Sequence, residues 1–500
     1  MRRPPAPAST SVAAVLVSIP IVLCACSGSG RGGQDVGSAG ASGDGGVAGA
    51  ADTAGSGGTT GTAGAAGTAG AAATAGASGS SGGGSGGSSA NSGGGGAAGS
   101  GGSGTGTCAG GAPSSGDVTI DLSDLRQKIS GFGASTAWGT TMSAADADLL
   151  WSTTTGAGLS LHRIRIDYTN GRTSELNIAQ QAVARGVTIW ATPWTPPVAY
   201  KSNNNAVSGT LTDGPAFAAF LTGFVSYMKG QGVDIFAVSA ENEPDANVTY
   251  ESCSYTPASM DAFITGAMGP AFADSGVEIM APETQNWCGF ADFEPTLVKN
   301  SFVSIVATHE YGCAPRAYPD IAQAGKEFWQ TEIFDQGSTV ADPGMGSALR
   351  VAKLIHDALT IANMNAWHYW WVYPATADNG ALWDKASNAP SKRLWVEGNF
   401  ARFVRPGFLR VGTSGIAPSG VLLSAYTNPA DGTVAIVAIN NNTTVTSLSL
   451  YISGAAPCGL TPWLTSASES LASYPALAVS GGRLSFMLGP LTVATLVGRP

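Results

Sequence analysis

The chain is 500 residues long and carries 34 acidic side chains against 24 lysines and arginines, a formal net charge of −10 at pH 7. This acidic balance argues against nucleic acid as a partner, because phosphate backbones bind surfaces rich in lysine and arginine. Much of the total of 70 glycines falls in the first quarter of the chain. The remaining length predicts one large domain with a smaller one attached.

The N-terminus has the pattern of an export signal. Arg2 and Arg3 precede an apolar run over residues 11–25 that is too short to span a bilayer comfortably. The run ends in Leu23-Cys-Ala-Cys26, which resembles a bacterial lipoprotein box and predicts a lipid anchor on Cys26. The alternative is an ordinary signal peptide whose two cysteines are incidental. We expect residues 1–26 to be a lipoprotein-type signal on an exported protein, either held at the bacterial cell surface or outer membrane by this anchor or secreted.

Residues 27–116 consist almost entirely of glycine, alanine, serine and threonine, without an aromatic residue. Such a segment cannot bury enough apolar surface to offset the entropy lost on ordering, so we predict a disordered linker. As a flexible coil of about 90 residues it would span on the order of 50 Å and hold the folded body away from the membrane.

Eight strand-like runs follow the linker, and amphipathic stretches of helical period separate them. Strands that alternate with helices of this length predict a parallel sheet with crossovers, and eight such units predict a closed (β/α)8 barrel over residues 129–394. The predicted strands cover residues 129–135, 161–167, 187–193, 235–241, 277–283, 303–309, 327–332 and 366–372. The predicted helices include residues 143–155, 175–185, 215–229, 257–274 and 347–361.

The pattern changes after Lys392, where short strands follow one another with turn residues between them and no helix. This pattern predicts an all-β sandwich over residues 395–500, with strands at 421–426, 433–440, 447–452, 483–488 and 492–497. A strand-like segment at residues 117–128 precedes the barrel, and we expect it to complete the sandwich. The predicted fold class is therefore α/β: a (β/α)8 barrel with an attached all-β sandwich.

Two short apolar strands of the predicted barrel end in a carboxylate. Glu243 follows the fourth strand within Asn242-Glu-Pro244, and Glu332 ends the seventh, about ninety residues later. The carboxyl ends of barrel strands meet at one face, so the two side chains are expected to face one cleft. Retaining glycoside hydrolysis needs one protonated carboxyl group and one ionised carboxylate. We predict Glu243 as the acid/base and Glu332 as the nucleophile, whereas each alone could be a surface glutamate at a strand end.

The order of motifs along the chain resembles glycoside hydrolase family 30, closest to its bacterial glucuronoxylanase and endo-xylanase branch. The similarity covers the chain from about residue 118 to the C-terminus. It implies a barrel flanked by a β-sandwich built from both chain ends, a retaining mechanism, a xylan-like polysaccharide as substrate, and the same roles for Glu243 and Glu332. The motifs are Gly131-Phe-Gly, Arg163, Thr192-Pro-Trp-Thr-Pro-Pro197, Asn242-Glu-Pro244, Thr308-His-Glu-Tyr-Gly312, Trp329-Gln-Thr-Glu332 and Phe403-Val-Arg-Pro-Gly407.

Further residues are predicted to bind substrate or to orient the carboxylates. An arginine beside the nucleophile would help to keep it ionised, and aromatic rings stack on the apolar faces of sugars. Each residue could instead have a purely structural role. The arginine could form a structural ion pair, the tryptophans could pack in the core, and the histidine could be buried with its hydrogen bonds made within the protein. The predicted substrate-binding residues are Trp138, Arg163, Trp194, Asn242, His309, Tyr311 and Trp370.

Two positions depart from the family pattern. Branch members that require a glucuronic acid side group carry an arginine shortly after the strand-eight tryptophans, but here the run Trp370-Trp-Val-Tyr-Pro-Ala375 is followed by no basic residue before Lys385. A guanidinium suits a carboxylate, so its absence predicts an endo-xylanase that does not depend on glucuronate. Glu241 stands where an uncharged residue is more usual, and it would either raise the pKa of Glu243 or pair with an arginine.

The sequence leaves other functions open. The same fold and mechanism could act on another β-glycan, such as β-1,6-galactan or a β-glucoside, or the chain could be a non-catalytic carbohydrate-binding protein. No metal or organic cofactor is implied, and the absence of a CxxC pair among the seven cysteines argues against zinc. The five cysteines Cys108, Cys253, Cys288, Cys313 and Cys458 could form disulfides in an exported protein, with the pairing left open. We expect a monomer.

Overall fold

The structure, a computed structural model, describes residues 108–374 and 376–500. The predicted signal, the anchor residue Cys26 and most of the predicted linker lie outside the described residues. Within the described part, no helix combines the length and the apolar character that a membrane span requires.

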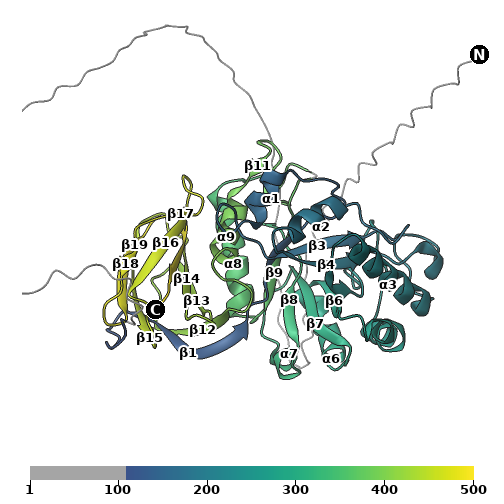
Figure 1. The fold of residues 1–500 in the computed structure, drawn as a ribbon, viewed down its shortest axis with the longest axis horizontal. Helices are drawn as coiled ribbons and strands as arrows, with labels where there is room; N and C mark the ends of the chain where they lie inside the picture. Colours follow the sequence, from purple (N-terminus) through teal and green to yellow (C-terminus); the bar gives the residue numbers. More distant parts are fainter. Residues whose placement is uncertain (1–107, 375) are drawn as a thin grey trace, which may run out of the picture. The chain divides into compact units, whose positions relative to one another are not determined.

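Eight parallel strands close into a barrel in the order β2-β3-β4-β5-β6-β7-β8-β9, which confirms the predicted (β/α)8 core (Figure 1). Every predicted strand is present, and the bounds differ by a few residues. Two strands run beyond their predicted ends toward the carboxyl face, where polar residues gather. The strands are β2 (Gly131–Ser135), β3 (Leu161–Ile166), β4 (Thr188–Pro193), β5 (Ile235–Ser239), β6 (Glu278–Asn286), β7 (Val303–Tyr311), β8 (Glu327–Gln330) and β9 (Ala366–Trp371).

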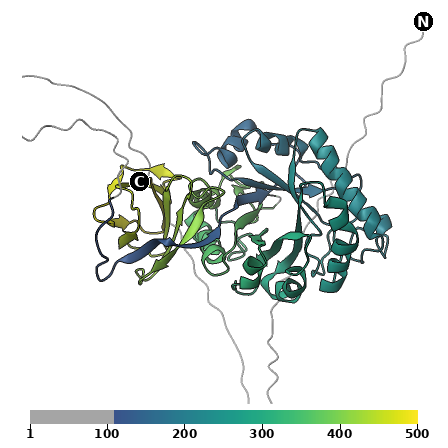
Figure 2. The ribbon, with the colours of Figure 1, turned by 60° about the horizontal axis from the view of Figure 1, so that its bottom comes forward.

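Helices surround the ring of strands, as the turned view shows (Figure 2). The predicted helix at 257–274 is interrupted by one π-helical turn, the kind of local irregularity that tertiary packing imposes. Side-chain oxygens cap several helices: Ser143 accepts from the backbone of Asp146, and Asp213 accepts from Ala216. The elements are α1 (Ala144–Trp151), α2 (Leu176–Val183), η1 (Val198–Tyr200), α3 (Gly214–Gly230), α4 (Pro257–Phe263), the π turn η2 (Ile264–Met268), α5 (Gly269–Phe272), α6 (Trp287–Leu297), α7 (Pro319–Gln323) and α8 (Met345–Thr360).

Large side chains fill the interior of the barrel below its carboxyl end. Trp190 and Trp329 are fully buried there, and Trp190 donates its indole N–H to Nε2 of His368 at 3.0 Å. His368 therefore carries its own proton on Nδ1, which donates to the carbonyl of Gln330 at 3.0 Å. This packed floor supports the polar residues at the strand ends above it.

One helix was missed. Residue 392 begins α9 (Lys392–Ala401), so the expectation of no helix after Lys392 is wrong, and the predicted domain boundary at residue 394 falls inside this element. Most of α9 is buried, including Glu397 and Asn399, so polar residues on covered positions hide the amphipathic pattern. The helix packs against the β-sheet domain, where Asn399 accepts from Thr495 Oγ1 at 2.6 Å.

The C-terminal domain is an all-β structure, as predicted. Its ten-stranded sheet has the order β17-β16-β20-β14-β13-β12-β1-β15-β19, with β18 paired to β16. The segment before the barrel forms β1 (Val118–Lys128), which lies between β12 and β15, so both ends of the chain contribute to this sheet. The other strands are β12 (Leu409–Ser414), β13 (Val421–Thr427), β14 (Val434–Asn440), β15 (Thr446–Ser453), β16 (Gly459–Thr465), β17 (Ala472–Ser473), β18 (Leu477–Ala478), β19 (Arg483–Leu488) and β20 (Thr492–Gly498), and a separate hairpin pairs β10 (Trp383–Asp384) with β11 (Ala389–Pro390).

The structure resolves the cysteine pairing that the sequence left open. Cys108 pairs with Cys458, which ties the start of the described chain to the sheet domain. Cys288 pairs with Cys313 and links the segments that follow β6 and β7, on the same face as the candidate carboxylates. Cys253 is buried without a disulfide.

Candidate active site

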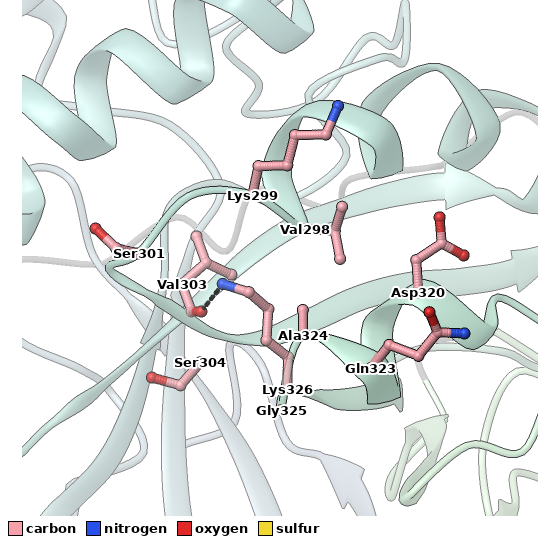
Figure 3. Close-up of a pocket in the computed structure, with 10 residues that line it drawn as sticks. All are labelled: Val298, Lys299, Ser301, Val303, Ser304, Asp320, Gln323, Ala324, Gly325 and Lys326. Atoms are coloured by element: carbon pink, nitrogen blue, oxygen red, sulfur yellow. Dashed lines mark hydrogen bonds between the residues drawn. The ribbon is translucent and has the colours of Figure 1, made fainter.

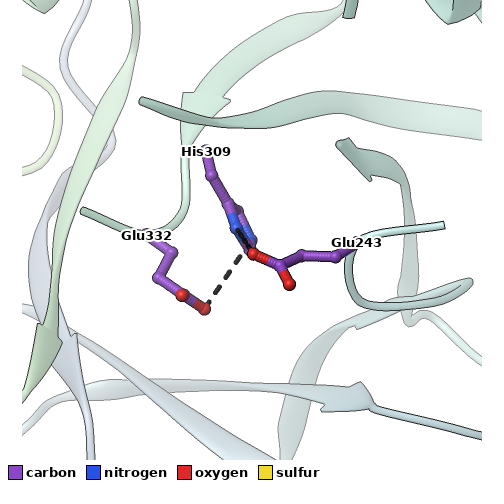
Figure 4. Close-up of side chains that lie close together, drawn as sticks. All are labelled: Glu243, His309 and Glu332. Atoms are coloured by element: carbon purple, nitrogen blue, oxygen red, sulfur yellow. Dashed lines mark hydrogen bonds and ion pairs between the residues drawn. The ribbon is translucent and has the colours of Figure 1, made fainter. Parts of the chain in front are cut away.

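The barrel brings the two predicted carboxylates together. Glu243 lies shortly after β5 and Glu332 shortly after β8, both at the carboxyl ends of their strands. Facing atoms of Glu243, Glu332 and His309 all lie within 4.8 Å of one another (Figure 4). Two residues that are about ninety positions apart in the sequence thus form one buried pair.

The backbone around Glu243 is held in an uncommon conformation. Glu243 has a φ of +48°, in the left-handed region that a non-glycine residue rarely adopts. Its amide N–H donates to the carbonyl of Glu283 at 3.0 Å, and the N–H of Asn242 donates to Pro193 at 2.9 Å. Neighbouring strands therefore hold the conformation that aims this side chain into the barrel mouth.

Both carboxylates have further hydrogen-bond partners. Oε1 of Glu243 lies 3.1 Å from His309 Nδ1, and its Oε2 accepts a hydrogen bond from the Tyr250 hydroxyl. Oε1 of Glu332 accepts from the Tyr311 hydroxyl at 3.0 Å.

The guanidinium of Arg163 joins Glu332 to the residue that precedes Glu243. Its Nη1 contacts Glu332 Oε2, and its Nη2 donates to Asn242 Oδ1 at 2.6 Å. The predicted residues Arg163, Asn242, His309 and Tyr311 are therefore all gathered around the two carboxylates.

Neighbouring charges set the protonation states of the side chains around the two carboxylates. Burial alone would lower the pKa of His309, but Glu332 and Glu243 together with Glu283 outweigh it and raise this pKa to about 9. Burial raises the pKa of Glu332, and His309 and Arg163 oppose that rise. At neutral pH the mouth therefore contains two cations, Arg163 and an imidazolium at His309.

The predicted aromatic platforms differ in exposure. Trp138 has a φ of +63° and is 40 % exposed, whereas Trp194 and Trp370 are only 2 % and 9 % exposed. The three rings form one cluster, with centroids 5.2 Å apart for Trp138 and Trp194 and 6.3 Å apart for Trp138 and Trp370. Trp138 offers an open ring surface at the mouth, while the other two support it.

The comparisons with known proteins agree with this architecture. The model of the glycosyl hydrolase family 30 TIM-barrel domain matches residues 161–384. The crystal structure of Xyn30A, a glycoside hydrolase family 30 subfamily 8 xylanase from Clostridium acetobutylicum, superposes with a TM-score of 0.70 at 32 % identity, covering 77 % of this chain and 100 % of that one. The chain belongs to glycoside hydrolase family 30. It is therefore a glycoside hydrolase.

Two more relatives of this family 30 protein cover a similar share of the chain. A GH30 endoxylanase from Clostridium papyrosolvens C71 is 30 % identical with a TM-score of 0.66, covering 77 % of this chain and 100 % of its own. The glucuronoxylanase XynC of Bacillus subtilis (strain 168) is 29 % identical over 406 residues, which is 77 % of this chain and 92 % of that protein.

Glu241 does not pair with an arginine. It is fully buried, both of its carboxylate oxygens lack a hydrogen-bond partner among the described residues, and the cation that acts on it is Lys201. Burial raises the pKa of Glu241 well above its ordinary value, so this family 30 enzyme holds it as a neutral carboxylic acid.

Sequence reasoning missed two residues of the site. Tyr250 lies in the segment after β5 and contacts Glu243, but the sequence around it carries no motif, and its closeness to Glu243 along the chain was the one available signal. Glu283 lies in β6, where it contacts Arg163 across the barrel. It ends a predicted strand just as Glu332 does, so the same reasoning about strand ends could have found it.

The mouth could in geometric terms hold a metal ion, since Glu243, His309 and Glu332 each offer a ligand atom. Metal binding needs a neutral imidazole and free carboxylate oxygens. Here the imidazole is protonated near neutral pH and Glu332 already contacts Arg163. The protonated imidazole and the contact of Arg163 with Glu332 therefore both disfavour a metal ion here.

An open hollow of about 780 Å³ lies at the opposite end of the barrel (Figure 3). Its lining includes Val303 and Lys326, which stand at and just before the starts of β7 and β8. Lys326 donates to the carbonyls of Asn300 and Val303. The lysine thus holds the starts of these strands, and the hollow is separate from the face where Glu243 and Glu332 lie.

Proposed function

We propose that this protein is a retaining endo-β-1,4-xylanase in which Glu243 is the acid/base and Glu332 the nucleophile. The observation that carries the proposal is the spacing of the pair, whose facing oxygens lie within 4.8 Å. Retaining enzymes hold their carboxyl groups close together, about 5 to 5.5 Å apart, and a pair whose nearest oxygens lie within 4.8 Å of each other fits that spacing. The xylanases among its family 30 relatives support the choice of substrate.

The first step uses both carboxylates at once. Glu332 attacks the anomeric carbon and forms a glycosyl ester, while Glu243 transfers its proton to the departing glycosidic oxygen. Arg163 and the Tyr311 hydroxyl hold the attacking carboxylate, and His309 and Tyr250 hold the acid. In the second step Glu243, now ionised, takes a proton from water as that water displaces Glu332 and restores the carboxylate.

The arrangement of charges supports action on undecorated xylan. Basic side chains near the mouth are engaged: Arg165 donates to both oxygens of Glu251, with its Nη1 3.5 Å from Asp167, and Lys201 donates to Ser252 and Thr195. The segment after Trp370 has no basic residue before Lys385. Without an uncommitted guanidinium there, a glucuronate carboxylate would gain little on binding, so cleavage should not require it.

A digestion experiment tests the substrate. Unsubstituted xylooligosaccharides, glucuronoxylan and β-1,6-galactan are incubated in parallel with the purified protein, and the products are separated and sized. Similar rates on plain and decorated xylan are expected. Products fixed by glucuronate positions would refute independence from decoration, and cleavage of galactan or a β-glucoside alone would refute the substrate while keeping the mechanism. No hydrolysis of any glycan would favour a carbohydrate-binding protein.

We also propose that the protein is exported and anchored through a lipid on Cys26, a residue outside the described part of the chain. The supporting observation is the apolar run that ends in Leu23-Cys-Ala-Cys26. Cell fractionation tests this proposal, with Cys26→Ala expected to move the protein from the membrane to the soluble fraction. A wild-type protein that is already soluble would refute the anchor.

A further inference from the structure

A third carboxylate lies buried beneath the catalytic pair. Glu283, in β6, is fully buried and has a φ of +55°. Its Oε2 accepts from the Thr192 hydroxyl at 2.8 Å, and its Oε1 lies 3.1 Å from Arg163 Nη2. The backbone carbonyl of Glu283 also accepts from the N–H of Glu243, so this residue is tied to the acid/base as well.

Glu283 shares both cations of the mouth with the catalytic carboxylates. Nε2 of His309 lies 3.8 Å from Glu283 Oε1 and 3.7 Å from Glu332 Oε2, while Nδ1 of the same ring faces Glu243. Arg163 likewise bridges Glu283 and Glu332. Each cation therefore touches Glu283 on one side and a catalytic carboxylate on the other.

The charges of these five groups balance in both states of the proposed reaction. The proposed mechanism requires an anionic Glu332 and a protonated Glu243 before the first step, and together with anionic Glu283 and cationic Arg163 and His309 these charges sum to zero. After it, Glu332 is an uncharged ester and Glu243 is anionic, so the sum is again zero. A neutral residue at position 283 would leave one uncompensated positive charge in either state, which is unfavourable in a buried site.

We propose that Glu283 is a positioning residue, a constant anion that keeps Arg163 and His309 in place as cations while charge moves between Glu332 and Glu243. The part of this proposal that concerns the glycosyl ester rests on the retaining mechanism proposed above. The part that concerns His309 stands on the free protein alone.

Other groups that face Glu283 do not take over this role. Burial lowers the pKa of His368 to about 3 and raises that of Glu241 well above its ordinary value, so both are neutral near pH 7. Burial would also raise the pKa of Glu283, but Arg163 and His309 outweigh it and hold this pKa at about 2. The titratable groups that act on Glu283 from the packed elements are Arg163 on β3, Glu241 and Glu243 after β5, His309 on β7, Glu332 after β8 and His368 on β9.

The first measurement is the charge of His309 in the free protein. The chain has four histidines, and burial lowers the pKa of the other three to about 3 or 4, so near pH 7 only His309 should be an imidazolium. Nitrogen-15 shifts of histidine-labelled protein read this charge directly. Glu283→Gln should lower the titration midpoint of His309 by about one to two pH units, because it removes an anion 3.8 Å away.

Glu310→Gln is the matched control. Glu310 is a buried glutamate directly after His309, but its side chain faces the other side of β7, where it accepts from the Trp367 indole at 3.1 Å. This variant should leave the midpoint of His309 unchanged. An equal midpoint in wild type, Glu283→Gln and Glu310→Gln would overturn the proposal, whatever the substrate proves to be.

The second measurement is kinetic, on whichever glycan the protein cleaves. Glu283→Gln should lower kcat about 10- to 100-fold with little change in KM, because Glu283 acts through the catalytic groups and does not touch the sugar. Glu283→Asp keeps the charge, so His309 should stay cationic at pH 7 and kcat should recover part of the loss.

The aspartate variant also decides the matter if Glu283→Gln does not fold. A wild-type kcat in Glu283→Asp together with a neutral His309 at pH 7 would overturn the proposal. Equal losses of kcat in Gln and Asp variants that both keep a charged His309 would reduce Glu283 to a packing role and would also overturn it.

Discussion

The barrel buries glutamates in two regions with opposite consequences. At the mouth, Glu283 and Glu332 lie against Arg163 and His309. In the outer region, away from the mouth, Glu310 on β7 and Glu397 on α9 are similarly buried, yet neither forms a salt bridge with a cation among the described residues. Burial raises the pKa of Glu310 to about 8 and that of Glu397 well above its ordinary value. At the mouth, Arg163 and His309 hold the pKa of Glu283 at about 2 and oppose the rise that burial causes for Glu332.

The comparison shows that burial by itself makes a carboxyl group neutral, and that catalysis of the proposed kind needs cations placed beside it. A nucleophile must be ionised at working pH, and only the mouth provides the charges for this. The outer glutamates are neutral structural groups although their residue type and burial are the same.

The largest expected effect comes from removing the catalytic carboxylates. Glu332→Gln should lower kcat about 10⁴-fold or more on xylan, because it removes the carboxylate on which the proposed glycosyl ester forms. Glu243→Gln should be comparably slow on xylan, but on an aryl xyloside, whose leaving group needs no proton, it should release a rapid first equivalent of phenol and then slow, because Glu243 is also the base of the second step.

Initial rates on both substrates check this prediction, with Glu397→Gln as the matched change in the outer region. That control should retain wild-type kcat. A Glu332→Gln protein that hydrolyses xylan at the wild-type rate would contradict the proposed mechanism.

The second test removes a cation instead of an anion. Arg163→Gln should leave Glu283 and Glu332 without their shared partner and cost about 3 to 5 kcal/mol of unfolding free energy at pH 7. Urea denaturation of the variant and wild type measures the difference. Since Glu283 has a lowered pKa in the folded protein, its contribution is present above about pH 4.5 and is lost as the pH falls toward 2. The gap between variant and wild type should therefore shrink in acid, and a gap that is constant with pH would contradict this account.

The outer region should show the reverse dependence on pH. The pKa of Glu310 is raised to about 8 in the folded protein, so the folded state keeps a proton that the unfolded state loses above about pH 4.5. The free energy of unfolding of the wild-type protein should therefore decrease as the pH rises from about 4.5 to about 8. Glu310→Gln removes this penalty, so it should stabilise the protein by on the order of 3 kcal/mol at pH 8 and change little at pH 4.5. Unfolding curves at both pH values check this, and a variant less stable than wild type at pH 8 would refute it.

Much of this arrangement was predictable from the sequence, because its signals are periodic or local. Strand and helix alternation gave the barrel, and Glu243 and Glu332 each end a recognisable apolar run. The parts that were not predictable depend on contacts across the fold. Helix α9 is covered by both the barrel and the sheet domain, so its residues show no polar face. The strand-end pattern points to Glu283 but equally to Glu310, and only the three-dimensional positions of Arg163 and His309 show which of the two belongs to the site.

The smallest expected effect on kcat comes from removing a tyrosine hydroxyl in the segment after β5, where two tyrosines allow a matched comparison. Tyr250 contacts Glu243, whereas the buried hydroxyl of Tyr255 lies next to Cys253 and touches neither catalytic carboxylate. Tyr250→Phe should lower kcat about tenfold, since a hydrogen bond to a charged or proton-transferring carboxyl group is worth roughly 1.5 to 3 kcal/mol, part of which water can replace. Tyr255→Phe should leave kcat unchanged. Steady-state rates of both variants on one substrate measure the difference. Equal rates would mean that the contact between Tyr250 and Glu243 contributes nothing to catalysis.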